Sequence, residues 1–175
     1  LGLRPLVDLE AARQMPTKQL LRELGVRFWR LPRLVRTFQS AAAEHAHTLQ
    51  LHPGLPETLR TLHRNGHRLG VLSSNHADNI RACLGQQGLV DSFHFIIGYP
   101  KLFGKARALR RILKQENVRR QDVLFVGDEL RDIEAGRKAR VDTAAVTWGF
   151  HADALLRQAR PTHLVHSPAD LLTIV

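Results

Sequence analysis

The sequence predicts an α/β protein with a Rossmann-like parallel sheet flanked by helices. From residue 50 onward, short apolar segments with strand character alternate with segments of helical periodicity, which is the pattern of βαβ units. The strand segments carry few charges, as expected when helices cover both faces of a parallel sheet. Residues 1–49 show only helical patterns. We therefore predict a small helical domain at 1–49 and an α/β core at 50–175.

Within the helical domain, the first clear helix is expected over 17–24, because Pro16 precedes it and Gly25 follows it. A second helix over 31–46 has an apolar stripe at helical spacing. In the core, glycines mark the ends of two further helices, at Gly66 and Gly88. The predicted core helices are 53–65, 77–87, 105–116, 132–140 and 168–172, and the predicted strands are 67–72, 93–97, 123–126, 143–147 and 163–165.

Composition excludes several classes of protein. The 175 residues contain one cysteine, Cys83, so a disulfide framework within the chain is excluded, and we read Cys83 as a small core residue. No run of about 18 apolar residues exists, so we expect no membrane span and a cytoplasmic protein. The net charge of +10 could serve a nucleic-acid partner. Arginine-rich, solvated helix faces explain it more simply, because aromatic residues are only 6% of the chain.

Polar side chains follow the predicted strand 67–72. Ser73, Ser74 and Asn75 come just before a predicted helix, where hydroxyls and backbone N–H groups suit a phosphate. Capping of that helix by Ser74 or Asn75 is the structural alternative, and taken alone it explains the segment at least as well.

A lysine follows the next strand. Lys105 begins a predicted helix directly after Gly104, where the helix dipole disfavours a cation. This suggests a role such as neutralising a phosphate in the crevice at the strand ends. An ordinary surface lysine is the alternative, and Lys101 is a second candidate for the same role.

Three acids follow the predicted strand 123–126. Asp128 and Glu129 come directly after Gly127, and Asp132 lies one helical turn onward. Helix capping accounts for part of this cluster. Three carboxylates at one strand end are costly to hold together unless a cation shares the site. Ligands bind at the carboxyl ends of parallel strands, so the cluster predicts a Mg²⁺ site.

The ordered set of a hydroxyl, a lysine and an acidic strand end resembles the haloacid dehalogenase-like (HAD) hydrolase superfamily. Ser73 matches motif II, Lys105 matches motif III and Gly127–Ala135 matches motif IV. The segments Phe103-Gly-Lys105 and Val146-Thr-Trp-Gly-Phe150 look like the phosphoglycolate phosphatase-like branch. Gly2-Leu-Arg-Pro5 and residues 15–25 look like the helical cap of that family.

The family's motif I, a strand ending in Asp-x-Asp, is absent from the 175 residues. Val7-Asp-Leu-Glu10 is not a match, because no apolar strand precedes it, no glycine follows it, and 11–13 reads as helix. The resemblance places the motif I strand between the strands of motifs II and IV. Without it, we expect unpaired backbone groups on both neighbours, each costing about 1–3 kcal/mol where buried. Roughly 30–40 residues, including this strand, are expected upstream.

The resemblance implies a Mg²⁺-dependent phosphomonoester hydrolase that acts on a small phosphorylated metabolite. An aspartyl-phosphate would form on the motif I aspartate. Ser73, Ser74, Asn75 and Lys105 would bind phosphate, Asp128 would bind Mg²⁺, and Asp132 or Glu129 would bind it directly or support the site. Two alternatives stay open: a non-catalytic family member that binds a ligand or a partner, and a nucleic-acid-associated phosphatase. The sequence does not predict an oligomeric state.

Overall fold

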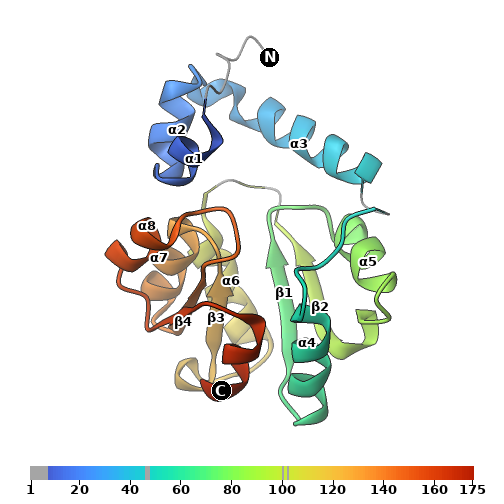
Figure 1. Ribbon diagram of the computed structural model, residues 1–175. Helices are drawn as coiled ribbons and strands as arrows, with labels where there is room; N and C mark the ends of the chain where they lie inside the picture. The colour runs from blue at the N-terminus through green and yellow to red at the C-terminus, as the bar shows by residue number, and fades with distance from the viewer. Residues whose placement is uncertain (1–7, 46–47, 100, 102) are drawn as a thin grey trace. The chain divides into compact units, whose positions relative to one another are not determined.

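A computed structural model of the protein describes residues 8–45, 48–99, 101 and 103–175 (Figure 1). The cap-like segment Gly2–Pro5, Val7 and residues 46–47 lie outside this range. The chain divides into two compact units, each described by itself. The first unit comprises Leu1–Leu31 and Phe103–Ser167, and the second comprises Pro32–Leu102 and Pro168–Val175.

The described residues before position 46 contain helices and turns and no strand, as predicted. Their regular elements are α1 (Leu9–Arg13), α2 (Thr17–Glu23), the 3₁₀ turn η1 (Phe28–Arg30) and α3 (Leu31–His45). Asp8 is the N-cap of α1, and its carboxylate accepts the Glu10 N–H at 2.9 Å. A capping role explains this acid and agrees with its rejection as motif I. The assignment of 1–49 as a separate cap domain stays a prediction.

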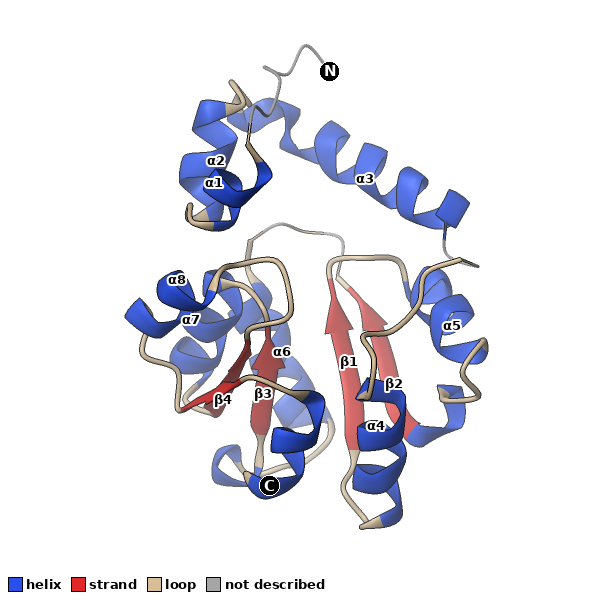
Figure 2. Ribbon diagram, viewed as in Figure 1, coloured by secondary structure: helices blue, strands red, loops and turns tan. Residues whose placement is uncertain are grey.

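The first unit contains a parallel sheet of three strands in the order β3-β4-β5, of which Figure 2 labels β3 and β4. Helix α7 packs on β3 and β4, and α6 packs on α7. A buried core cluster of this unit consists of Ile133, Ala145 and Leu156. The strands are β3 (Leu124–Gly127), β4 (Asp142–Val146) and β5 (His163–Val165), and the helices and turn are α6 (Lys105–Gln115), η3 (Arg120–Asp122), α7 (Leu130–Ala139) and α8 (Asp153–Gln158).

The second unit contains two parallel strands, in register from Gly70↔Phe95 to Ser73↔Gly98. Figure 1 shows them side by side, and α5 packs against β2. Leu84, Leu89 and Ile96 form the buried cluster between these elements. The elements are α4 (Leu55–Arg64), β1 (Leu69–Ser73), α5 (Ala77–Gly85), the turn η2 (Val90–Ser92), β2 (Phe93–Gly98) and the closing turn η4 (Pro168–Thr173).

Every predicted strand is present, and so is every predicted helix except 168–172, with ends shifted by a few residues, which confirms the α/β class. Three details differ. The segment 168–172 is a 3₁₀ turn, and α8 was not predicted, because six residues give too short a periodic pattern. Cys83 is half-buried rather than in the core, and burial raises the pKa of its thiol. No described helix has the length and apolarity to cross a membrane.

β1 and β3 each have a free edge within the described residues, as do β2 and β5 at the other sides of the two sheets. β1 pairs only with β2, and β3 pairs only with β4. Val126 in β3 is 41% exposed, which is unusual for an apolar residue in a parallel sheet covered on both faces. β1 and β3 are the two strands that the family resemblance places on either side of motif I. The position of motif I itself stays a prediction.

Candidate active site

Asp128 lies just beyond the carboxyl end of β3, in the turn that leads into α7. The backbone N–H of Phe150 donates to Asp128 Oδ2 at 2.7 Å, and the backbone N–H of His151 donates to the Asp128 carbonyl at 3.2 Å. The other carboxylate oxygen, Oδ1, makes no hydrogen bond or ion pair with a described residue. One oxygen of Asp128 is therefore fixed by the loop after β4, and the other is available to a ligand.

Close backbone packing holds this turn in place. A Cβ at Gly149 would lie 2.1 Å from Asp128 Cβ, and a Cβ at Gly127 would lie 2.4 Å from Asp132 Cβ. Both neighbours are Cβ atoms next to the backbone, so a small side-chain movement cannot relieve either contact. Glycine at 127 and 149 lets the loop and the turn approach each other closely.

Replacing Gly149 by alanine is expected to displace Asp128 and to lower the free energy of unfolding by about 1–3 kcal/mol, the usual range for overpacking. Urea denaturation measures the effect. Gly85→Ala is the matched control, because a Cβ there would meet only Val90 Cγ2, at 3.9 Å, and alanine favours the helix. Equal stability of the Gly149→Ala variant and the natural protein would show that the loop is not packed as described.

Lys105 and Asp132 form an ion pair in the first unit. Lys105 Nζ lies 2.5 Å from Asp132 Oδ1, and the two side chains are 14% and 6% exposed. Asp132 Oδ2 also accepts the backbone N–H of Glu129 at 3.3 Å. The pairing explains how a cation is tolerated in the first turn of α6. It also leaves the Asp132 carboxylate occupied by protein donors.

Glu129 is the N-cap of α7 and forms a capping box with Asp132, and its side chain has two further partners. Its Oε1 pairs with Arg131 Nη2 at 2.5 Å, and its Oε2 accepts the Thr17 hydroxyl at 3.4 Å. Thr17 is the first residue of α2, so a residue from the predicted cap contacts the acidic turn of the same unit. Glu129 therefore connects the turn to α2.

Arg13 makes a second connection from the helical segment. Its guanidinium donates to the Phe150 carbonyl at 2.9 Å and to the Gly149 carbonyl at 3.2 Å, and the Ala152 N–H donates to the Arg13 carbonyl at 3.1 Å. These bonds fix the same loop whose Phe150 N–H reaches Asp128. Arg13 thus stabilises the loop that orients the carboxylate.

His151 is fully buried behind the acidic turn. Its Nδ1 accepts the Leu130 N–H at 3.0 Å, so Nδ1 carries no proton and the imidazole is neutral. Burial is the main cause that lowers the pKa of His151, and it outweighs the nearby carboxylates of Glu129 and Asp128, which raise this pKa. Its Nε2 makes no hydrogen bond with a described residue. Sequence reasoning missed both His151 and Arg13, since each acts through contacts distant in sequence.

Ser73, Ser74 and Asn75 follow β1 in the second unit. Ser73 Oγ accepts the Asn75 N–H at 3.2 Å, so its proton can still be donated to a ligand. Asn75 Oδ1 accepts from the His76 N–H at 2.8 Å and from Asn79 Nδ2 at 2.9 Å. The N-cap of α5 is His76, with no side-chain cap hydrogen bond, so neither Ser74 nor Asn75 caps this helix as the structural alternative expected. Lys101, the alternative to Lys105, is exposed, with its Nζ 5.8 Å from the Tyr99 ring centroid.

The acids do not form a metal cage by themselves. Among the described residues, no three Asp, Glu, His or Cys side chains gather as metal ligands. Mg²⁺ at phosphate sites usually takes one or two carboxylates, with water and substrate phosphate as the other ligands. Asp128, with its available Oδ1, fits this requirement. The Asp132 and Glu129 side chains pair with Lys105 and Arg131, which suits them to supporting positions, and direct ligation by either one stays a prediction.

Comparisons with known proteins identify the family of the chain. The sequence pattern of the haloacid dehalogenase-like hydrolases matches residues 5–146. The chain belongs to this family. A phosphoglycolate phosphatase from Synechococcus elongatus is 36% identical over 168 residues, which are 96% of this chain and 79% of that protein. This similarity confirms the resemblance to the phosphoglycolate phosphatase-like branch.

Two more distant similar proteins extend the comparison. Pyrophosphatase PpaX of Listeria welshimeri is 26% identical over 163 residues, covering 82% of this chain and 75% of that protein. A haloacid dehalogenase-like hydrolase of known structure from Streptococcus pneumoniae has a TM-score of 0.78 and 20% identity, covering 97% and 82% of the two chains. The structural similarity supports the HAD fold.

Proposed function

We propose that this HAD protein is a Mg²⁺-dependent phosphomonoester hydrolase acting on a small phosphorylated metabolite. The observation that carries the proposal is Asp128, which follows a strand end, offers one carboxylate oxygen that no described residue contacts, and lies one helical turn before Asp132 of the buried Lys105–Asp132 pair. A free carboxylate oxygen can bind a hard cation, and a lysine can bind an anionic phosphate oxygen. Phosphoryl transfer requires both.

The metal would be held by Asp128 Oδ1, with Asp132 and Glu129 in support, and it would neutralise charge on the phosphoryl oxygens. Lys105, oriented by Asp132, would add a positive charge near the same phosphate. Ser73 would donate its hydroxyl proton to a phosphoryl oxygen, and the N–H groups of Ser74 and Asn75 would assist. The nucleophile would be the first aspartate of an Asp-x-Asp motif supplied by sequence upstream of the 175 residues, forming an aspartyl-phosphate that water hydrolyses.

The substrate is proposed from the relatives' names. Phosphoglycolate is the first candidate, because the relative from Synechococcus elongatus is 36% identical and is a phosphoglycolate phosphatase. Inorganic pyrophosphate is the second, because the Listeria relative is a pyrophosphatase. Comparing kcat/KM for the two compounds would rank them. A cytoplasmic location stays a prediction.

The test is hydrolysis of p-nitrophenyl phosphate and phosphoglycolate by a chain that carries the Asp-x-Asp strand upstream. We expect turnover with Mg²⁺ and none with EDTA, with activity returning when Mg²⁺ is added back in excess. Full activity in EDTA would refute the metal role. The non-catalytic alternative would be supported if the natural sequence lacks Asp-x-Asp and the folded protein hydrolyses no phosphate ester.

A further inference from the structure

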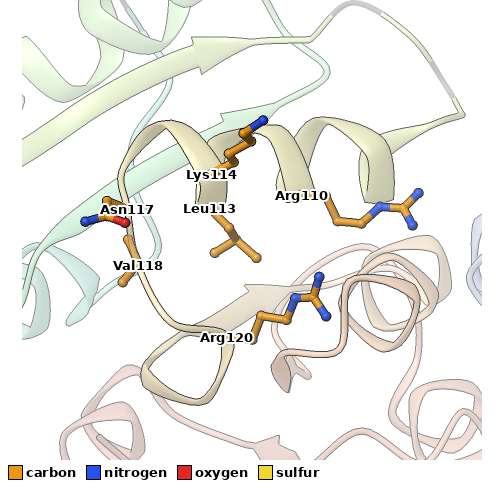
Figure 3. A pocket seen from close by; sticks show the side chains of 6 residues that line it. All are labelled: Arg110, Leu113, Lys114, Asn117, Val118 and Arg120. Atoms are coloured by element: carbon orange, nitrogen blue, oxygen red, sulfur yellow. The ribbon is translucent and has the colours of Figure 1, made fainter.

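The first unit has a basic pocket on the surface, formed by the C-terminal part of α6 and the segment leading to β3. Its volume is about 410 Å³. Six residues line this basic pocket: Arg110, Leu113, Lys114, Asn117, Val118 and Arg120 (Figure 3). The size falls within the range of small-molecule sites.

The basic pocket is distinct from the candidate active site. Lys105 begins α6, whereas the pocket lies around residues 110–114 of this helix and beyond its end. Asp128 follows the carboxyl end of β3, whereas Arg120 precedes the amino end of the same strand. The pocket therefore belongs to the opposite end of this βα layer, and no residue proposed for phosphate hydrolysis lines it.

The charge of the basic pocket is not compensated within the described residues. Arg110, Lys114 and Arg120 form no ion pair there. The neighbouring Arg119, by contrast, forms an ion pair with Asp122, in which Arg119 Nε lies 2.6 Å from Asp122 Oδ2. The dipole of α6 favours a cation at its C-terminal end, which accounts for Lys114 alone. Arg110 lies mid-helix and Arg120 lies outside the helix, so they have no such explanation.

The side chains divide the basic pocket into two ends. Figure 3 shows the guanidinium groups of Arg110 and Arg120 on the same side, with Asn117 and Val118 on the other side and Leu113 between them. Leu113 is buried and Val118 is half-buried, so they offer an apolar wall. Two planar guanidinium groups suit the oxygens of phosphates. A ligand that fits this pocket has an anionic group that faces the two arginines. Its other end is flat or apolar, packs on the apolar wall and also carries a group that can form a hydrogen bond with an amide.

We propose that the basic pocket binds a nucleoside diphosphate. The phosphates would lie between Arg110 and Arg120, the sugar and base would cover Leu113 and Val118, and the Asn117 amide would hydrogen-bond the base. This inference does not depend on the proposed hydrolase activity, because the two sites share no residue.

Binding can be measured by isothermal titration calorimetry with ADP, adenosine and inorganic pyrophosphate, in EDTA and at physiological salt. We expect ADP to bind more tightly than either fragment. Arg110→Gln and Arg120→Gln should each weaken ADP binding by about tenfold, the loss of one charge-assisted hydrogen-bonding group. Arg111→Gln is the matched control, since Arg111 is exposed on the same helix and does not line the pocket. It should leave the affinity unchanged.

Three results would overturn the proposal. Equal ADP affinity in all variants would place the nucleotide elsewhere, including the candidate active site. Equal affinity for ADP and pyrophosphate would show adventitious ion binding only. A polynucleotide that binds the natural protein far more tightly than ADP, with the same two arginines required, would assign the surface to nucleic acid.

Discussion

Replacing Asp128 by asparagine is expected to lower kcat/KM on an aryl phosphate by at least about 100-fold, the scale seen when one preorganised charge-stabilising group is removed. Asparagine keeps a side-chain oxygen that can accept the Phe150 N–H, now at 2.7 Å, so the turn should stay folded. What is lost is the negative charge that holds Mg²⁺. The assay uses the chain with its Asp-x-Asp strand and saturating Mg²⁺.

The control for this prediction is Asp91→Asn, since Asp91 is exposed in η2 of the second unit and takes no part in the proposed site. It should retain full activity. A direct readout of the metal is Mn²⁺ binding followed by electron paramagnetic resonance, which should weaken in Asp128→Asn only. Unchanged hydrolysis and unchanged Mn²⁺ affinity in this variant would remove Asp128 from the site.

Replacing Lys105 by methionine is expected to lower the free energy of unfolding by about 3 kcal/mol. The reason is the Asp132 carboxylate, which is 6% exposed and would lose the ammonium 2.5 Å from its Oδ1. Urea denaturation of both proteins gives the difference. The variant should also lose most hydrolytic activity, because the proposed phosphate site would lose a cation.

A double variant separates the two effects of Lys105. Lys105→Met/Asp132→Asn carries no buried charge at the pair, and the asparagine can still accept the Glu129 N–H. We expect it to regain most of the lost stability and none of the activity. Lys138→Met removes a surface lysine that is 68% exposed and 3.8 Å from Glu134, and it should cost less than about 1 kcal/mol. If the single and double variants were equally unstable, the buried pair would not be the cause.

The sequence predicted the secondary structure well because each element carries its own local signal. Helix α6 shows an apolar face in its residue spacing, and its start at Lys105 was marked by Gly104, which adopts a left-handed conformation with φ of 98°. Strand β3 was marked by an apolar run ending in Gly127. By contrast, α8 is short, and its buried Leu155 and Leu156 are recognised only from their packing.

The candidate site was predictable as a list of residues and not as a set of contacts. Asp132 and Glu129 were expected to bind the metal or to support its site, and this stays a prediction. The sequence did not predict that Asp132 pairs with Lys105 and Glu129 with Arg131. Both pairings depend on which way a side chain points after the chain has folded, which residue order alone does not encode.

The order of polar residues at the ends of apolar strands determined the fold class and the family of this protein, since strand and helix patterns are local and the motifs are contiguous. Only the tertiary structure decided the partners. It brought Arg13, Gly149, Phe150 and His151 around Asp128, because hydrogen bonds between distant segments form only where packing sets their distance. It also left one oxygen of Asp128 without a partner among the described residues, and this oxygen is the one proposed to bind Mg²⁺.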